Sequence, residues 1–291
     1  MELRPARRDQ IAELVDFCEH FPLAPSWSLP AARLLSDLPS CDACILDVWD
    51  QGERQAVAVV IDTVRNLDNV ALLEVMGRLP TAGSTFLSLM QPVAERLVRE
   101  AGRWGLECYL PEHLGWSTAF QEAGWGFARD AFMMERADSE IPGPTLPTGL
   151  RWRDLEPADV LSYYHLVQEA FAEDPGVQLA DYPSFLRALE SRDLPIRLLC
   201  RYEKLLGFVR VSIENGVGNL DSLGRAPAWR GKGLGPLVVA EGARILNAHG
   251  ATRLRLGVTG NNVAARTLYR NLGFVDLERS EVWLRWLPEA G

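Results

Sequence analysis

The chain carries one unit twice, and this repeat restricts its fold more than any other feature. Leu3-Arg4 precedes a charged turn and an amphipathic stretch, and Leu150-Arg151 does the same 147 residues later. Towards the other end, Gly124 is followed by a strand-like run, and Gly273 is followed by another at an offset of 149 residues. A repeat of this length predicts two copies of one domain.

A linker separates the two copies. Residues 138–149 read DSEIPGPTLPTG, and their three prolines and two glycines favour neither a helix nor a sheet ladder. We therefore expect a first domain over residues 1–137 and a second over residues 150–291. The chain has 291 residues, which is enough for two domains of ordinary size.

Both copies mix helices with strands in the same order. Apolar residues recur at helical spacing in some stretches and alternate in others, and Asn215-Gly216 is a hairpin signal. A strand–helix–strand crossover follows the hairpin, which predicts an α/β fold with a mixed, mostly antiparallel sheet between helices. The elements expected in the second copy are helices at 157–171, 181–189, 234–249 and 262–272, and strands at 196–202, 206–214, 218–223 and 253–258, before two final strands.

Composition narrows the classes of function. The formal net charge of −9 opposes binding to nucleic acid or to an anionic membrane, and favours a neutral or cationic small molecule. No apolar run approaches the ~20 residues that span a bilayer, and the charged N-terminus differs from a signal peptide, so we expect a cytoplasmic protein. Cys41 and Cys44 form a lone C-x-x-C, which favours reduced thiols over a metal site.

A glycine-rich turn, Arg230–Gly235 (RGKGLG), lies between a predicted strand and a predicted helix. Backbone N–H groups at such a helix start, together with the helix dipole, bind anions such as a diphosphate. The phosphate-loop pattern is absent, and the dinucleotide pattern fails because Pro236 stands where its third glycine is required. Nucleotide hydrolysis and dinucleotide redox chemistry are therefore disfavoured.

The turn fits R-x-x-G-x-G, and a second pattern follows it from Asn262 to Phe274, N-x-x-A-x-x-L-Y-x-x-x-G-F in outline. With both patterns in order, residues 150–291 resemble the GNAT superfamily of acyl-CoA-dependent N-acyltransferases. The first half is similar only in element order, since Leu79–Ser84 replaces the turn with LPTAGS, which lacks a basic residue. The whole chain resembles a tandem GNAT protein with a degenerate N-terminal copy.

The resemblance implies acetyl-CoA as co-substrate and no metal. The backbone of Gly231–Gly235 would hold the pyrophosphate, with Arg230 and Lys232 either adding charge or remaining solvated. The pantetheine arm would lie between two parallel strands that splay apart, one of them reaching Arg225. Asn262 would contact this arm, cap the next helix, or do both. The residues implied at acetyl-CoA are Leu223, Arg225, Arg230, Gly231, Lys232, Gly233, Leu234, Gly235, Asn262, Ala265 and Tyr269.

Two residues are the catalytic candidates. Tyr269 would give a proton to the departing thiolate, unless it only packs on the sheet. Asp221 would take the proton of the attacking amine, unless it is only an exposed strand end, and Glu214 is the second choice. The segment 163–182 mixes acidic and aromatic residues, as a site for a cationic amine would; charge on a helix face can equally be solvation.

The expected function is N-acetyl transfer from acetyl-CoA to a primary amine of a small molecule or peptide. The amine would attack directly within a ternary complex. The alternative is a non-catalytic scaffold that responds to acyl-CoA and is built on two GNAT-like domains.

Overall fold

The computed structural model describes residues 2–6, 8–20, 45–61, 70–76, 83–100, 102, 104–174, 182–190 and 194–287. Cys41, Cys44, most of the Leu79–Ser84 turn and the last part of the segment 163–182 lie outside the described residues. The chain divides into two compact units: Met1–Ala131 with Glu278–Gly291, and Phe132–Leu277. The domain boundaries expected on either side of residues 138–149 stay a prediction; residues 137–149 form neither helix nor strand.

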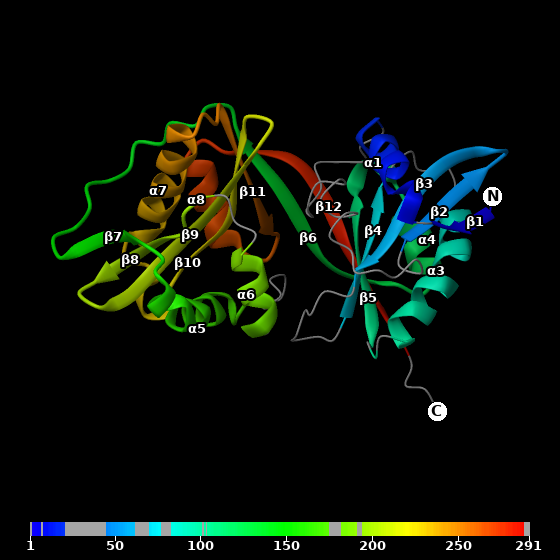
Figure 1. Cartoon of the computed structure of the whole chain (residues 1–291), viewed down its shortest axis with the longest axis horizontal. Coiled ribbons are helices and arrows are strands. Elements are labelled where there is room, and N and C mark those ends of the chain that lie inside the picture. Colours follow the sequence, from blue (N-terminus) through cyan, green and yellow to red (C-terminus); the bar gives the residue numbers. More distant parts are fainter. Residues whose placement is uncertain are drawn as a thin grey trace. The chain divides into compact units, whose positions relative to one another are not determined.

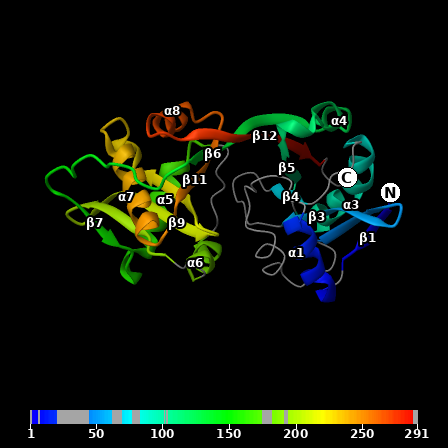
Figure 2. The ribbon, with the colours of Figure 1, turned by 90° about the horizontal axis from the view of Figure 1, so that it is seen from above.

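The first unit is a sheet in the order β1-β2-β3-β4-β5-β12, with a helix packed on each face (Figures 1 and 2). Its neighbours pair antiparallel, except that β4 and β5 pair in parallel. Alternate residues of β3 enter different cores, so Ala58 packs with α3 and Val59 packs with α1. Its elements are β1 (Glu2–Pro5), α1 (Ile11–His20), β2 (Ile45–Asp50), β3 (Glu53–Ile61), β4 (Val70–Met76), α3 (Gly83–Glu100), β5 (Gly105–Pro111), α4 (Ser117–Glu122), the first half of β6 (Gly126–Arg136) and most of β12 (Val275–Trp286).

The second unit repeats this plan, with the strand order β6-β11-β10-β9-β8-β7 (Figure 1). The strands β10 and β11 pair in parallel, whereas β7, β8, β9 and β10 pair antiparallel. Along β9, Phe208 joins the core beneath α5 and Val209 joins the core beneath α7, so these helices cover opposite faces. Its elements are β7 (Leu150–Asp154), α5 (Val160–Phe171), α6 (Tyr182–Glu190), β8 (Arg197–Arg201), β9 (Lys204–Glu214), β10 (Val217–Arg225), α7 (Leu234–Ala248), β11 (Arg253–Thr259) and α8 (Val263–Asn271).

One long strand ends each half of the chain, β6 in the first half and β12 in the second. The expectation of two short final strands is therefore wrong, because the alternating pattern continues without a turn residue. Ser280–Trp286 of β12 pairs antiparallel with Gly105–Pro111 of β5, so the last strand of the second half completes the sheet of the first unit. The expected α/β class, with a mixed sheet between helices and a central parallel pair, is confirmed in both units.

The repeat is also visible in matching contacts. In the first unit, Arg285 at the end of β12 donates from Nη1 to Gly124 O (2.8 Å). In the second unit, Arg136 at the end of β6 donates from Nη1 to Leu272 O (2.6 Å). The two arginines stand 149 residues apart, which is the offset of Gly124 from Gly273. Each half thus lends its final strand to the helix turn of the other half.

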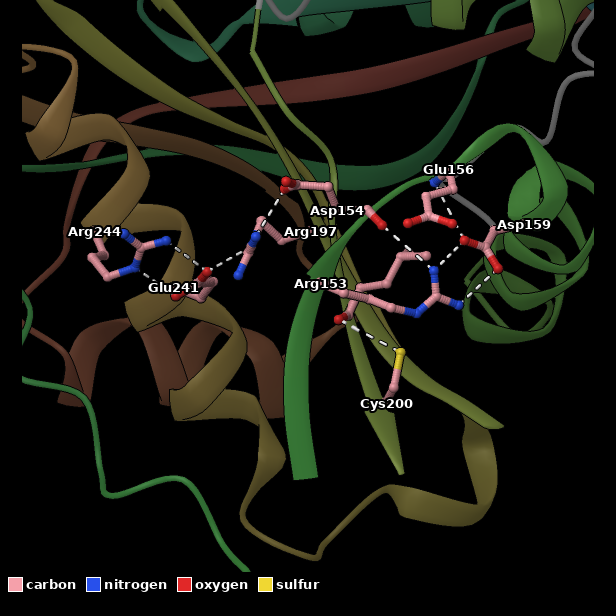
Figure 3. A network of polar contacts seen from close by, with 9 residues as sticks. Arg153, Asp154, Glu156, Asp159, Arg197, Cys200, Glu241 and Arg244 are labelled. Carbon is pink, nitrogen blue, oxygen red and sulfur yellow. Dashed lines mark hydrogen bonds and ion pairs between the residues drawn. The ribbon is translucent and has the colours of Figure 1, made fainter. Parts of the chain in front are cut away.

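Charged side chains fix α7 to the sheet of the second unit (Figure 3). Glu241 on α7 is 7% exposed and accepts hydrogen bonds from Arg197 Nε on β8 (2.9 Å) and Arg244 Nε (2.8 Å). Arg197 Nη1 also donates to Asp154 Oδ1 on β7 (2.8 Å). Breaking a buried pair leaves a charge without compensation, so this network holds α7 firmly in place. Among the described residues, no helix is both long and apolar enough to cross a membrane.

Candidate active site

The central feature of the second unit is the point where β10 leaves β11. Their parallel ladder joins Val217–Asn219 to Arg253–Arg255 and ends there, although both strands are described to their ends. The ladder between β10 and β9 shifts register between Asn219 and Ser222, which places a bulge at this point, and then continues to Arg225. A bulge bends its strand. The far half of β10 therefore has a backbone edge that β11 does not pair.

The glycine turn follows the end of β10 and opens α7. Gly231 and Gly233 have φ angles of 74° and 77°, in the left-handed region that favours glycine. Gly233 is the N-cap of α7, and no atom lies within 4 Å of a Cβ placed on either glycine. The first N–H groups of α7 have no partner within the helix. This arrangement can bind an anion at the helix start.

Gly235 serves packing. It is buried, and a Cβ placed on it would lie 2.8 Å from Leu268 Cδ2 on α8. The absent side chain lets the first turn of α7 approach α8, the helix that carries the second sequence pattern. The two patterns thus meet in space.

The basic side chains of the turn point to protein groups. Arg230 donates from Nη2 to Ala170 O (3.1 Å) and pairs through Nη1 with Glu173, so it joins the turn to the C-terminal end of α5. Lys232 Nζ lies 4.8 Å from the ring centre of Trp229. Arg225, expected to act through its main chain, also brings its guanidinium to α7, since Nη1 lies 3.6 Å from a Cβ placed on Gly235.

Asn262 caps α8. Its Oδ1 accepts from the backbone N–H of Ala265 (3.1 Å), so the N-cap interpretation is correct and contact with a pantetheine arm stays a prediction. Its Nδ2 donates to Asp174 Oδ2 (3.2 Å), and Thr259 Oγ1 donates to Asp174 Oδ1 (3.1 Å). Residues from the end of α5, the end of β11 and the start of α8 thus meet at one carboxylate.

Tyr269 projects from α8 into the core of the second unit and is 7% exposed. Its ring centre lies 6.0 Å from that of Phe274. Burial raises the pKa of Tyr269 to about 12; the positive charge of Arg225 lowers this pKa, and the negative charge of Asp174 raises it. The phenol therefore keeps its proton at neutral pH and can act as a proton donor.

Asp221 lies at the bulge of β10 and is exposed. It accepts a hydrogen bond from Ser212 Oγ on β9 (2.8 Å). Glu214, the second choice for the base, is exposed at the end of β9. Asp174, which the sequence placed in the acidic and aromatic segment 163–182 and not among the candidate bases, is the carboxylate whose charge acts on Tyr269.

The corresponding place in the first unit has different chemistry. The offset of 149 residues puts Phe120 at the position of Tyr269 and Trp116 at that of Ala265. The nearest Trp116 ring atom lies 2.7 Å from a Cβ placed on Gly83, the first residue of α3. The ring centres of Trp116 and Phe86 are 5.4 Å apart. An indole thus covers the start of α3, and a phenyl ring replaces the phenol.

Metal ligands and thiols add nothing to this site. In the part of the chain that the structure describes, no group of three or more His, Cys, Asp and Glu residues could hold a metal ion. Cys18, Cys108 and Cys200 are buried and form no disulfide in that part.

Comparisons with known proteins agree with this geometry. Residues 160–274 match the acetyltransferase (GNAT) family. A mycothiol acetyltransferase of Kineococcus radiotolerans is 35% identical over 55% of each chain, and one of Streptomyces avermitilis is 26% identical over 78% of this chain and 90% of its own. The chain spans about half the length of the first relatives that it matches.

Solved structures resemble the fold over nearly the whole chain. A GCN5-related N-acetyltransferase from Sphaerobacter thermophilus has a TM-score of 0.74 at 20% identity, covering 98% of this chain and 95% of that one. A tandem GNAT protein from the clavulanic acid biosynthesis pathway has a TM-score of 0.72 at 14% identity and covers 100% of both chains.

Proposed function

We propose that the chain transfers an acetyl group from acetyl-CoA to a primary amine, since residues 160–274 match the acetyltransferase (GNAT) family. One observation carries the proposal. The glycine turn at the start of α7 lies beside α8, where the buried phenol of Tyr269 is available as a proton donor. An anion site and a proton donor are what a diphosphate-bearing thioester requires.

The proposed acetyl-CoA site runs along the free edge of β10 to the glycine turn. Backbone groups of Leu223 and Arg225 hold the pantetheine arm in the way an added strand pairs with a sheet edge. The N–H groups of Gly231–Gly235, including those of Lys232 and Leu234, hold the pyrophosphate. The open space above Gly231 and Gly233 supports this assignment, since a side chain there would occupy the place of the phosphates. Asn262 and Ala265 line the other side.

The proposed reaction is a direct acyl transfer. The amine nitrogen forms a bond to the acetyl carbon, and the bond from that carbon to sulfur breaks. The departing thiolate receives the phenolic proton of Tyr269, which burial keeps on the oxygen. The amine loses a proton to a base. Two carboxylates of this unit are candidates for that base, Asp221 on β10 and Asp174 after α5.

Relatives supply the first acceptor to test. Several of them are named mycothiol acetyltransferase, so mycothiol without its acetyl group is the leading candidate for this chain. Glucosamine is a second candidate, because a solved structure of similar fold is described as a glucosamine N-acetyltransferase region. Both present a primary amine on a small polar molecule.

The test is acetylation of a panel of these amines, with spermidine added, by purified protein and acetyl-CoA. Mass spectrometry of the product is the readout, because an acceptor that carries a thiol would itself react in a thiol assay. We expect an acetylated product, and Tyr269→Phe should lower kcat by about 10²-fold, since a lost proton donor typically costs this much.

Tyr202→Phe is the control, because it removes an exposed phenol from the turn between β8 and β9. Tight binding of acetyl-CoA with no product from any amine would contradict the proposed function and favour a scaffold. Unchanged turnover by Tyr269→Phe would remove this tyrosine from the reaction.

A further inference from the structure

We propose that Asp174, in the turn after α5, is the carboxylate that binds the acceptor's ammonium group and takes its proton. This inference rests on the proposed function, and it names the residue that the acceptor meets. It assigns Asp221 no part in the proton transfer. Thr259 and Asn262 hold the Asp174 carboxylate in place, and its charge acts on the Tyr269 phenol.

Hydrogen bonds fix the Asp174 turn to the ends of α5 and β11 and to the start of α8. The backbone N–H of Asp174 donates to Phe171 O (2.9 Å), which continues the last turn of α5. Thr259 Oγ1 and Asn262 Nδ2 donate to its carboxylate at 3.1 Å and 3.2 Å. Thr259 is 8% exposed and Asn262 caps α8, so both donors are themselves held in place. A carboxylate so positioned needs little further ordering to receive a ligand.

Arg230 joins this turn to the proposed pyrophosphate site. Its guanidinium contacts Ala170 O and Glu173, just before Asp174, while its backbone begins the glycine turn. The last residues of α5 thus bridge the two elements that would bind acetyl-CoA, the start of α7 and the start of α8. The turn that carries Asp174 thus adjoins both of these elements.

The charge of Asp174 acts on Tyr269, the proposed proton donor. Its negative charge raises the pKa of the Tyr269 phenol, and the Arg225 charge acts on the same phenol in the opposite sense. Glu173 and Arg230 form an ion pair beside the turn. A carboxylate whose charge acts on a buried phenol can serve as the base while the phenol serves as the acid.

Asp174 is also reachable. Its residue is half-buried, whereas Tyr269 is buried, so an acceptor can approach the carboxylate from solvent. In the proposed step, the bound ammonium group first gives one proton to the Asp174 carboxylate, and the neutral nitrogen then forms its bond to the acetyl carbon and loses its second proton to solvent. The carbon–sulfur bond breaks, and the sulfur takes the Tyr269 proton. Solvent then returns a proton to Tyr269 and removes one from Asp174.

The experiment measures kcat/KM against pH for wild type and Asp174→Asn, with the amine panel described above. At pH 7 we expect a loss of about 10²-fold, typical of a missing general base. The loss should shrink as the pH approaches about 10, where an alkylamine is neutral without help. A merely structural role would lower activity equally at every pH, and that result, or no loss, would overturn the proposal.

A matched control and a second readout keep the test independent of the acceptor. Asp16→Asn removes a carboxylate that is 74% exposed on α1 of the first unit, and its pH profile should follow wild type. Tyrosine ionisation is followed by ultraviolet difference titration with Tyr269→Phe subtracted. Asp174→Asn should lower the pKa of Tyr269. If wild type acetylates no amine, the proposed function fails; an unchanged Tyr269 pKa would separately overturn the role of Asp174.

Discussion

At the scale of single residues, the proposed chemistry depends on how burial changes the pKa of Tyr269. The phenol stands in an apolar core, so its charged form is disfavoured and its pKa rises to about 12. A phenol of ordinary pKa, about 10, is already a weak acid. Raising it further keeps the phenol protonated before the reaction, and it also makes the phenol a weaker acid. Arg225 offsets part of this effect through its positive charge.

The raised pKa of Tyr269 links stability to alkaline pH. The unfolded chain ionises this phenol near pH 10, and the folded chain near pH 12. The folded state binds the proton more tightly, so its contribution is complete below pH 10 and is lost between about pH 10 and 12. Urea unfolding should show this loss in wild type beyond that in Tyr269→Phe. Equal pH dependence of the two would contradict the burial of this hydroxyl.

Residues that belong to a local pattern could be predicted, and residues that act through space could not. Asn262 and Tyr269 belong to the second pattern, at the start of α8 and within it, so their spacing predicted them, and residues 160–274 match the GNAT family that this pattern indicated. Asp174 lies 85 residues before Thr259 and has no periodic signature. The guanidinium of Arg225 was likewise unforeseen, because its direction depends on the approach of α7.

At the scale of elements, the site depends on α7 lying close to β9 and β10. The two strands and the helix share one core, and Gly242 on α7 permits their close contact. A Cβ placed on Gly242 would lie 2.9 Å from Val209 Cγ2 and would also strike Leu220, which stands at the bulge. Because position 242 carries no side chain, α7 can pack directly against the bulge at which β10 leaves β11.

Substitution at Gly242 tests that support. Gly242→Ala should destabilise the protein by about 1–3 kcal/mol, since overpacking a tight core costs this much and exceeds the gain in helix propensity. Asn247→Ala, at an exposed position of the same helix, should be neutral or slightly stabilising. Denaturant midpoints compare them. A stabilised Gly242→Ala would show that α7 and β10 can separate freely.

The splay of β10 and β11 follows from the sequence only in part. A strand, a glycine turn and a helix could be predicted from apolar spacing and from Arg230–Gly235. Residues 219–222, where the register shifts, include no glycine or proline, so the sequence did not predict the shift. Likewise, nothing in the sequence of β6 or β12 indicates that each pairs with a strand of the other half, because strand pairing depends on how the whole core packs.

At the scale of the whole molecule, the duplicated fold holds one proposed active site. The first unit has the same parallel pair, whose ladder joins Val70–Leu73 to Gly105–Cys108. Phe120 there lacks the hydroxyl of Tyr269, and Trp116 covers the start of α3. The copies have kept the architecture, since each supplies the final strand of the other's sheet, while the chemistry is concentrated in the second.

The most direct measurement is a calorimetric titration of the full chain with acetyl-CoA. We expect one binding site per chain, and Gly233→Val should abolish it, because a β-branched residue at φ 77° is strained and would fill the open space above the turn. Gly216→Val carries similar strain at φ 75° in the hairpin at the other end of β10 and should keep binding. Two sites per chain, no binding by wild type, or undiminished binding by Gly233→Val would contradict a single acetyl-CoA site in the second unit.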